Sequence, residues 1–164
     1  MNATKSAKTA IAAALLCGAS AAAAEENINS MVFQAPIQEV YNYVSKPNLW
    51  HEWHPASLGA DSSSDKDLAV GEHFKEQIRL YGKEVEMDYK VVIARPPYEF
   101  KTAFVSPMID GSIHYQLEEV DGGTHFTRTL NYSIEKYLTS LQEQMQQASG
   151  VALSNLKERL ESSN

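Results

Sequence analysis

The sequence predicts an α+β domain in which one long C-terminal helix covers an antiparallel sheet. Two observations carry this prediction. Between residues 58 and 134 apolar residues alternate with polar ones, and turn residues interrupt the alternation at short intervals. From Ile134 to Leu160 apolar residues instead recur every three or four positions, which is the helical period. A meander of this kind has one apolar face, and we expect the helix to bury it.

Length and charge restrict the class of protein. The chain has 164 residues, of which 43% are hydrophobic and 21% charged, and its formal net charge is −7. This length suits one domain, and neither an internal repeat nor a Pro- or Gly-rich linker divides the chain. Binding to nucleic acid requires clustered Lys and Arg, whereas here 14 basic residues face 21 acidic ones. We therefore expect no nucleic-acid partner.

The first 24 residues have the pattern of a secretory signal peptide. Lys5 and Lys8 precede a largely apolar run, and Ala22-Ala23-Ala24 provides small residues before a cleavage site. We predict cleavage after Ala24, a single mature domain over residues 25–164, and a secreted or periplasmic location, with no integral membrane segment left after cleavage. Two alternatives are a retained membrane anchor and lipid modification of Cys17. Cys17 is the only cysteine, so the mature domain would contain no disulfide.

The N-terminal part of the domain contains a strand and two short helices. Residues 28–34 are predicted to form the strand, with Met31 and Phe33 on one face. Pro36 suits the first turn of a helix over residues 37–44, whose apolar stripe is Ile37, Val40, Tyr41 and Val44. A second short helix contains both tryptophans, Trp50 and Trp53, and ends at Pro55. Residues 61–67, which are rich in Ser and Asp, predict a solvated loop or an irregular edge strand.

The predicted meander has strands over residues 74–80, 85–93, 100–104, 113–117 and 126–132. Gly82, Pro96-Pro97 and Asp121-Gly122-Gly123 mark three of its turns. The C-terminal helix is predicted to span about 27 residues, or about 40 Å. Gly150 in its middle suggests a kink or a close approach. The apolar stripe of this helix is Ile134, Leu138, Leu141, Met145, Ala148, Ala152, Leu156 and Leu160.

Several short motifs occur together in a characteristic order. They are Phe33-x-Ala35-Pro36-x-x-x-Val40-x-x-x-Val44, Pro47-x-x-Trp50-x-x-Trp53-His54-Pro55, Arg95-Pro96-Pro97 and Asp121-Gly122-Gly123-Thr124. Over residues 27–160 the chain resembles the SRPBCC superfamily, which includes START lipid-transfer domains, polyketide cyclases and dehydrases, and the major birch-pollen allergen. The resemblance implies a helix-grip fold, in which a curved antiparallel sheet wraps around the C-terminal helix and two short helices follow the first strand. It also implies an apolar cavity between sheet and helix that holds a hydrophobic small molecule or lipid.

The side chains expected to face inward are unusually aromatic. Rigid rings that cannot all interdigitate tend to leave a pocket, although a filled core is the equal alternative. The inward aromatic set is Phe33, Phe74, Tyr89, Phe100, Phe104, Tyr115, Phe126 and Tyr132. We predict a ligand-binding set of Trp50, Trp53, Phe74, Ile78, Tyr89, Phe100, Phe104, Tyr115, Phe126, Arg128, Leu141 and Met145.

Two charged residues have the strand parity of their apolar neighbours. Arg128 lies between Phe126 and Leu130, and Glu76 lies two residues after Phe74. Burying either charge costs several kcal/mol unless it is paired or used on a ligand. One hypothesis is that Arg128 binds a carboxylate or polarises a carbonyl, with Glu76 as the other candidate catalytic residue. The alternatives are a structural Arg–Glu pair, or a bulge that turns one of the two outward.

No motif predicts a metal or a cofactor. His51 and His54 are three residues apart, and together with His73, His114 or His125 they could in principle bind zinc, but H-E-x-x-H is absent. The chain also lacks G-x-S-x-G, a phosphate-binding Gly loop and a dinucleotide fingerprint. We expect neither a metal nor a cofactor.

Three functions follow as hypotheses. The first is an exported, non-catalytic protein that binds a hydrophobic ligand. The second is an enzyme resembling polyketide cyclases and dehydrases, in which Arg128, Glu76 or a tyrosine would steer proton transfer. The third is an interaction module that presents Trp50 and Trp53 to a protein partner; an exposed apolar patch there would favour it.

Overall fold

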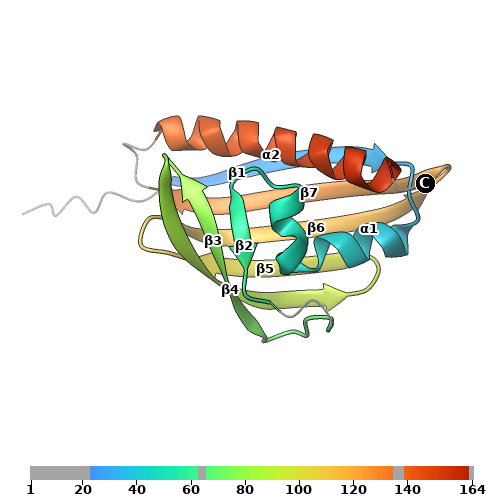
Figure 1. Cartoon of the computed structure of the whole chain (residues 1–164), viewed down its shortest axis with the longest axis horizontal. Helices are drawn as coiled ribbons and strands as arrows, with labels where there is room; N and C mark the ends of the chain where they lie inside the picture. The colour runs from blue at the N-terminus through green and yellow to red at the C-terminus, as the bar shows by residue number, and fades with distance from the viewer. Residues whose placement is uncertain (1–22, 63–65, 135–138, 163–164) are drawn as a thin grey trace, which may run out of the picture.

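The computed structural model describes residues 23–62, 66–134 and 139–162 (Figure 1). Seven strands, one α-helix and one 3₁₀-helix lead to a C-terminal α-helix. In chain order the elements are β1 (Ala23–Phe33), α1 (Ile37–Val44), η1 (Pro47–Glu52), β2 (Ser57–Ala60), β3 (His73–Leu80), β4 (Lys83–Arg95), β5 (Glu99–Val105), β6 (Asp110–Val120), β7 (Gly123–Ile134) and α2 (Thr139–Glu161).

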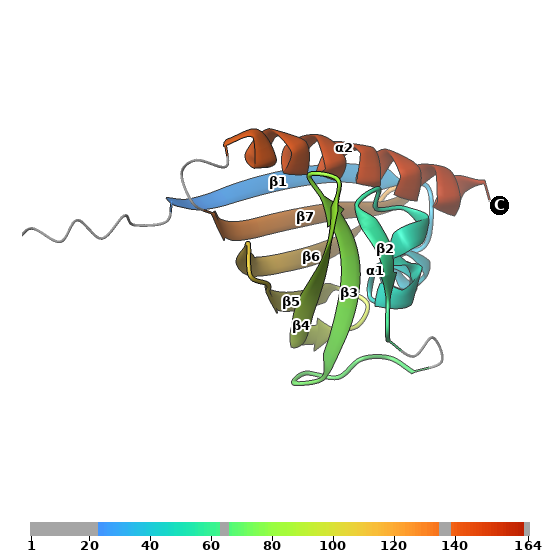
Figure 2. The same ribbon diagram turned by 60° about the vertical axis from the view of Figure 1, so that its left-hand side comes forward.

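All seven strands form one antiparallel sheet in the order β1-β7-β6-β5-β4-β3-β2. The sheet curls, so that β3 and β4 run steeply across the direction of β1 and β7, while α2 lies along β1 and β7 (Figure 2). The two short helices, α1 and η1, follow the first strand and close one end of the curl (Figure 1). The predicted helix-grip fold is confirmed.

The prediction for the start of the C-terminal helix was wrong. Ile134 is the last residue of β7, where it pairs with Ala23 of β1, and α2 begins at Thr139. β7 extends to Ile134 because β1 pairs with it along its whole length, as far as Ala23. This strand pairing determines the conformation of Ile134, although its spacing from the next apolar residues fits a helix. Leu138 lies outside the described residues. The helix has 23 residues rather than 27, which corresponds to about 34 Å.

Two details of the sheet differ from the predicted pattern. β2 is a four-residue edge strand that precedes the Ser- and Asp-rich segment. Asp61 continues its pairing by donating its backbone N–H to the carbonyl of Lys75 at 2.9 Å, and the Asp61 carboxylate accepts the backbone N–H of Lys75 at 2.6 Å. Residues 63–65 of that segment lie outside the described part. In β4 the pairing shifts between Val91 and Ile93. Because of this bulge, Ala94 rather than Ile93 contacts the core.

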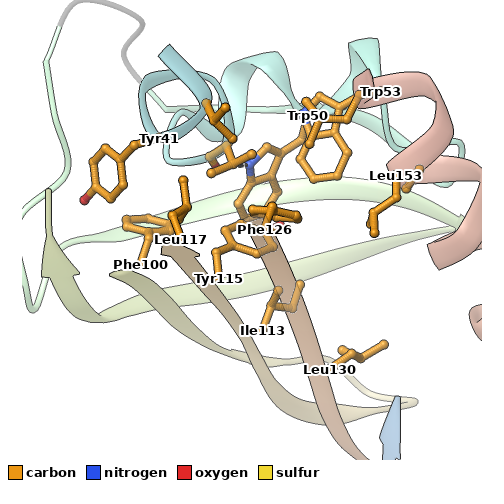
Figure 3. Close-up of a cluster of buried hydrophobic side chains, with 14 of the residues drawn as sticks. Tyr41, Trp50, Trp53, Phe100, Ile113, Tyr115, Leu117, Phe126, Leu130 and Leu153 are labelled. Carbon is orange, nitrogen blue, oxygen red and sulfur yellow. Dashed lines mark hydrogen bonds between the residues drawn. The ribbon is translucent and has the colours of Figure 1, made fainter. Parts of the chain in front are cut away.

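Both tryptophans lie inside the core, with exposed fractions of 3% for Trp50 and 1% for Trp53 (Figure 3). Trp50 donates its indole N–H to the carbonyl of Val44 at 2.8 Å, and its ring meets Phe74 and Tyr89 edge to face. The two rings therefore form no exposed patch for a protein partner, contrary to the third hypothesis. All eight predicted inward-facing aromatic residues are buried.

None of the described helices is both long enough and apolar enough to cross a bilayer.

Candidate functional site

A cavity of about 260 Å³ lies between the curled sheet, η1 and α2. Its walls are mainly apolar and come from β3, β4, β5, β6, β7 and α2. Trp50 and Trp53 contribute to the lining, as do Leu130 of β7 and Met145 of α2. The alternative of a completely filled core is therefore excluded.

Eight of the twelve residues predicted to contact a ligand line this cavity. They are Trp50, Trp53, Ile78, Tyr89, Phe104, Tyr115, Arg128 and Met145. The other four do not line it and instead form the packed core around it. These four are Phe74, Phe100, Phe126 and Leu141, with exposed fractions of 5% or less. Phe74 stacks on Tyr89 with ring centroids 4.8 Å apart, so Tyr89 is the ring at the cavity surface.

The sequence analysis missed several lining residues. Met87, Ile113 and Leu130 share the strand parity of the aromatic residues, so the alternating pattern contained this signal. Ser149 follows Met145 by one helical turn and is 1% exposed, but a serine gives no hydrophobic signal. His54, which the sequence suggests only as a possible metal ligand, lies in the cavity wall.

Arg128 is the central polar residue of the site. It lies on β7, opposite Tyr115 of β6 and Asn29 of β1, and is 3% exposed. Its Nη1 donates to Ser149 Oγ at 2.8 Å, and this hydroxyl in turn donates to the carbonyl of Met145. Its Nε is buried and has no hydrogen-bond partner among the described residues.

No carboxylate in the described part of the chain lies within 4.0 Å of the Arg128 guanidinium. The structural alternative of a direct ion pair with Glu76 is therefore not realised. No bulge turns either residue outward, since both are 3% exposed. Arg128 is thus a buried cation that lines a cavity without a carboxylate in direct contact.

Glu76 of β3 supplies the second charged group of the cavity wall. Burial raises the pKa of its carboxyl group from 4.5 to about 7, and the nearby hydroxyls of Ser57 and Tyr89 and the charge of Arg128 oppose this shift. Near neutral pH the side chain of Glu76 can therefore hold or release a proton.

His54 is held in its neutral form. Burial, followed by the positive charge of Arg128, lowers the pKa of His54 well below its usual range. Its Nδ1 accepts the backbone N–H of Ala56 at 3.3 Å, so the proton of the neutral ring is on Nε2. Burial also raises the pKa of Tyr89 and Tyr115, which remain protonated phenols.

The histidines do not assemble a metal site. Within residues 23–62, 66–134 and 139–162, no three side chains of His, Cys, Asp or Glu come together in a way that could hold an ion. His51 and His73 are exposed, and His114 hydrogen-bonds to Glu99 at 2.7 Å outside the cavity.

Solved structures with this fold are numerous and distant in sequence. A protein of unknown function from Staphylococcus aureus superposes with a TM-score of 0.70 at 14% identity, over 87% of this chain and 97% of that one. A protein from Chromobacterium violaceum gives 0.68 at 15% identity, over 83% and 96%. The allergen Ara h 8.0201 gives 0.64 at 12% identity, over 85% and 99%. At such identities the likeness establishes the fold alone.

Comparison with the sequence patterns of protein families identifies the family, which the solved structures do not. No curated protein matches the chain. One family, described as polyketide cyclase / dehydrase and lipid transport, matches residues 29–161, which include every described element except the first residues of β1. The chain therefore belongs to the polyketide cyclase / dehydrase and lipid transport family of the SRPBCC superfamily.

Proposed function

We propose that this protein binds a hydrophobic small molecule in the cavity between the sheet and α2, with a polar end of the ligand at Arg128. One observation carries the proposal: a buried guanidinium lines a largely apolar cavity and has no carboxylate in direct contact. A buried charge of this kind is costly unless a ligand or solvent in the cavity compensates it. The described family also includes lipid transport.

The cavity volume limits the size of the ligand. Pockets for drug-sized ligands range from about 300 to 1,000 Å³, and about 260 Å³ lies just below this range. A compact ring or a short acyl chain fits such a volume better than a steroid or a long-chain lipid.

Native mass spectrometry of the protein purified from its own compartment tests the proposal directly. We expect a bound small molecule of low mass, released on denaturation and identifiable by fragmentation. In titrations with that molecule, Arg128→Met should weaken binding, whereas Arg95→Met removes an arginine outside the cavity lining and should not. Unchanged binding by Arg128→Met would refute the role of Arg128.

We further propose that the protein acts outside the cytoplasm. The support is the sequence of residues 1–24, with its basic start, apolar run and small residues before Glu25. Cell fractionation followed by N-terminal sequencing tests this. A mature chain that begins at Glu25 in the periplasm or the medium is expected, and a full-length chain in the cytoplasm would contradict export.

A second candidate function is acid–base catalysis on a hydrophobic substrate, as in cyclases and dehydratases. The observation that favours it is that the pKa of Glu76, at about 7, allows proton transfer near neutral pH in the same cavity as Arg128. Glu76 would exchange a proton with a carbon or oxygen next to a carbonyl that Arg128 polarises.

Turnover separates the two candidates. The molecule identified by mass spectrometry would be incubated with the wild-type protein and with Glu76→Gln, and its mass and structure followed over time. A carrier returns the molecule unchanged with both proteins. An enzyme converts it with the wild type, and Glu76→Gln binds it but loses most of the conversion.

A further inference from the structure

We propose that the ligand is a small amphipathic monoanion, a carboxylate with an apolar tail, and that it binds together with a proton taken up by Glu76. This inference rests on the proposed function of the cavity and adds the chemical class of the ligand and a coupling to pH. It follows from the charges that face the cavity from each surrounding element.

Few charged or titratable groups line the cavity. α2 contributes Gln144, Met145, Ala148 and Ser149, none of which carries a charge. β3 contributes Glu76 and Arg79, and Arg79 is exposed at the rim, where it pairs with Glu84 at 3.4 Å. The remaining titratable groups are the imidazole of His54 and the phenols of Tyr89 and Tyr115, which are neutral as described above. Among the described residues that line the cavity, only Arg128 and Glu76 can carry a charge inside it.

The protonation of Glu76 decides the net charge of the cavity. When Glu76 is ionised, the two opposite charges balance, and a second anion would be repelled by the carboxylate. When Glu76 is protonated, Arg128 leaves a net charge of +1 in an apolar enclosure, which favours one compensating anion. A dianion would need a second buried cation, and the described lining has no other than Arg128.

The guanidinium of Arg128 retains capacity for such an anion. Of the five N–H donors of this group, Ser149 accepts one, from Nη1. Tyr115 lies close to the same group, and Nε, which has no acceptor among the described residues, is buried away from the cavity surface. The Ser149 bond fixes the orientation of the planar group, and a fixed guanidinium matches a carboxylate in a bidentate geometry. The apolar wall, which includes Ile113 and Leu130, accepts the tail.

The coupling between the anion and Glu76 has a definite sign. An anion beside Arg128 places a second negative charge near Glu76 and raises the pKa of this carboxyl group above its value of about 7 in the free protein. Binding then takes up a proton at neutral pH. If only the protonated form binds, the dissociation constant for an anion rises roughly 100-fold between pH 6 and pH 9, and that for a neutral molecule does not.

Octanoate and 1-octanol are suitable probes because they share a chain of eight carbons and differ in charge. Trp50 and Trp53 are the only tryptophans and both line the cavity, so their fluorescence reports occupancy. We expect octanoate to bind more tightly than 1-octanol at pH 6 and to lose this advantage towards pH 9. Calorimetry at pH 7.5 in two buffers of different ionisation enthalpy should show proton uptake with octanoate alone. This last measurement needs no variant.

Three variants test which residues cause the pH-dependent binding of octanoate. Glu76→Gln should bind octanoate with an affinity that is constant between pH 6 and pH 9. Arg128→Met should weaken octanoate binding roughly tenfold or more, and by a larger factor than it weakens 1-octanol binding. Arg95→Met, the control, should leave both affinities and the pH dependence unchanged.

The outcomes separate the inference from the proposed function. Equal and pH-independent binding of both probes would overturn the inference and leave a cavity that binds hydrophobic molecules. Binding of 1-octanol without binding of octanoate would also overturn the inference and leave the proposed function intact. If neither probe binds at any pH, the proposed function fails, and the inference fails with it.

Discussion

The site depends on one side chain whose surroundings come from three parts of the chain. Arg128 faces inward because β7 alternates without a bulge between Phe126 and Leu130, which are 0% and 3% exposed. Ser149 of α2 holds its Nη1, and Tyr115 lies opposite on β6. Arg128 is thus anchored by a neutral hydroxyl, which leaves its charge available to the cavity.

The bond between Arg128 and Ser149 should contribute measurably to stability. Ser149→Ala removes the acceptor of a buried, charged donor, and we expect a loss of about 1–3 kcal/mol in the free energy of unfolding. Ser154→Ala, on the exposed side of the same helix, is the matched control and should change it by less than about 0.5 kcal/mol. Urea denaturation of both variants measures the difference. Equal effects would show that the buried bond contributes nothing specific.

Glu76 should make stability depend on pH. The pKa of its carboxyl group is about 7 in the folded protein against 4.5 in the unfolded chain. Its contribution is therefore fully present below pH 4.5 and is lost as the pH rises to about 7, by about 3 kcal/mol in total. Denaturation of the wild type between pH 4.5 and pH 8 should show this loss relative to Glu76→Gln. Glu143→Gln, on the exposed side of α2, should retain the wild-type dependence.

At the scale of elements, α2 connects otherwise separate parts of the fold. Asn155 donates to the carbonyl of Trp53 at 3.0 Å and thereby links the helix to the residue after η1. Near its end, Glu161 accepts the backbone N–H of Gln34, just after β1. The helix is therefore attached at both ends of the α1-η1 segment, and the cavity lies beneath its N-terminal half.

Gly150 in α2 offers a stabilising substitution. It is exposed, and a Cβ added there would meet no atom within 4 Å, so the close approach suggested by the sequence does not exist. Gly150→Ala should raise the free energy of unfolding by up to about 1 kcal/mol, because alanine favours the helix. Thermal unfolding would show a higher midpoint, and an unchanged or lower midpoint would contradict this prediction.

Substitution of Gly123, at the start of β7, by alanine should lower the stability of the protein, in contrast to Gly150→Ala. A Cβ built at this position would lie 1.9 Å from the carbonyl oxygen of Phe33, which belongs to the backbone and cannot move easily. Gly123→Ala should therefore destabilise the protein by about 1–3 kcal/mol. The same thermal measurement tests it, with Gly150→Ala as the comparison.

At the scale of the whole molecule, alternation and helical spacing predict the order of the elements, but long-range pairing decides where they end. Ile134 shows the limit of prediction from local spacing: its spacing fits a helix, but it pairs with Ala23 of β1 as part of a strand. The parity of Arg128 and Glu76 predicts their burial, since parity is a local property. Which residues line the cavity depends on how the whole sheet curves. No local sequence pattern therefore distinguishes Phe74, which packs behind the wall, from Tyr89, which lies at the cavity surface.

The length of β1 has a consequence for the timing of maturation. The strand begins at Ala23, and Ala24 and Glu25 pair with Ser133 and Tyr132 of β7. The bond proposed as the cleavage site, between Ala24 and Glu25, therefore lies within a strand that is paired to β7 on one side and forms an edge of the sheet on the other. Cleavage at this proposed site would then be faster before β1 pairs with β7 than after it. Signal peptidase should cut the denatured full-length chain and leave the refolded one intact; rapid cutting of the refolded chain would contradict this order.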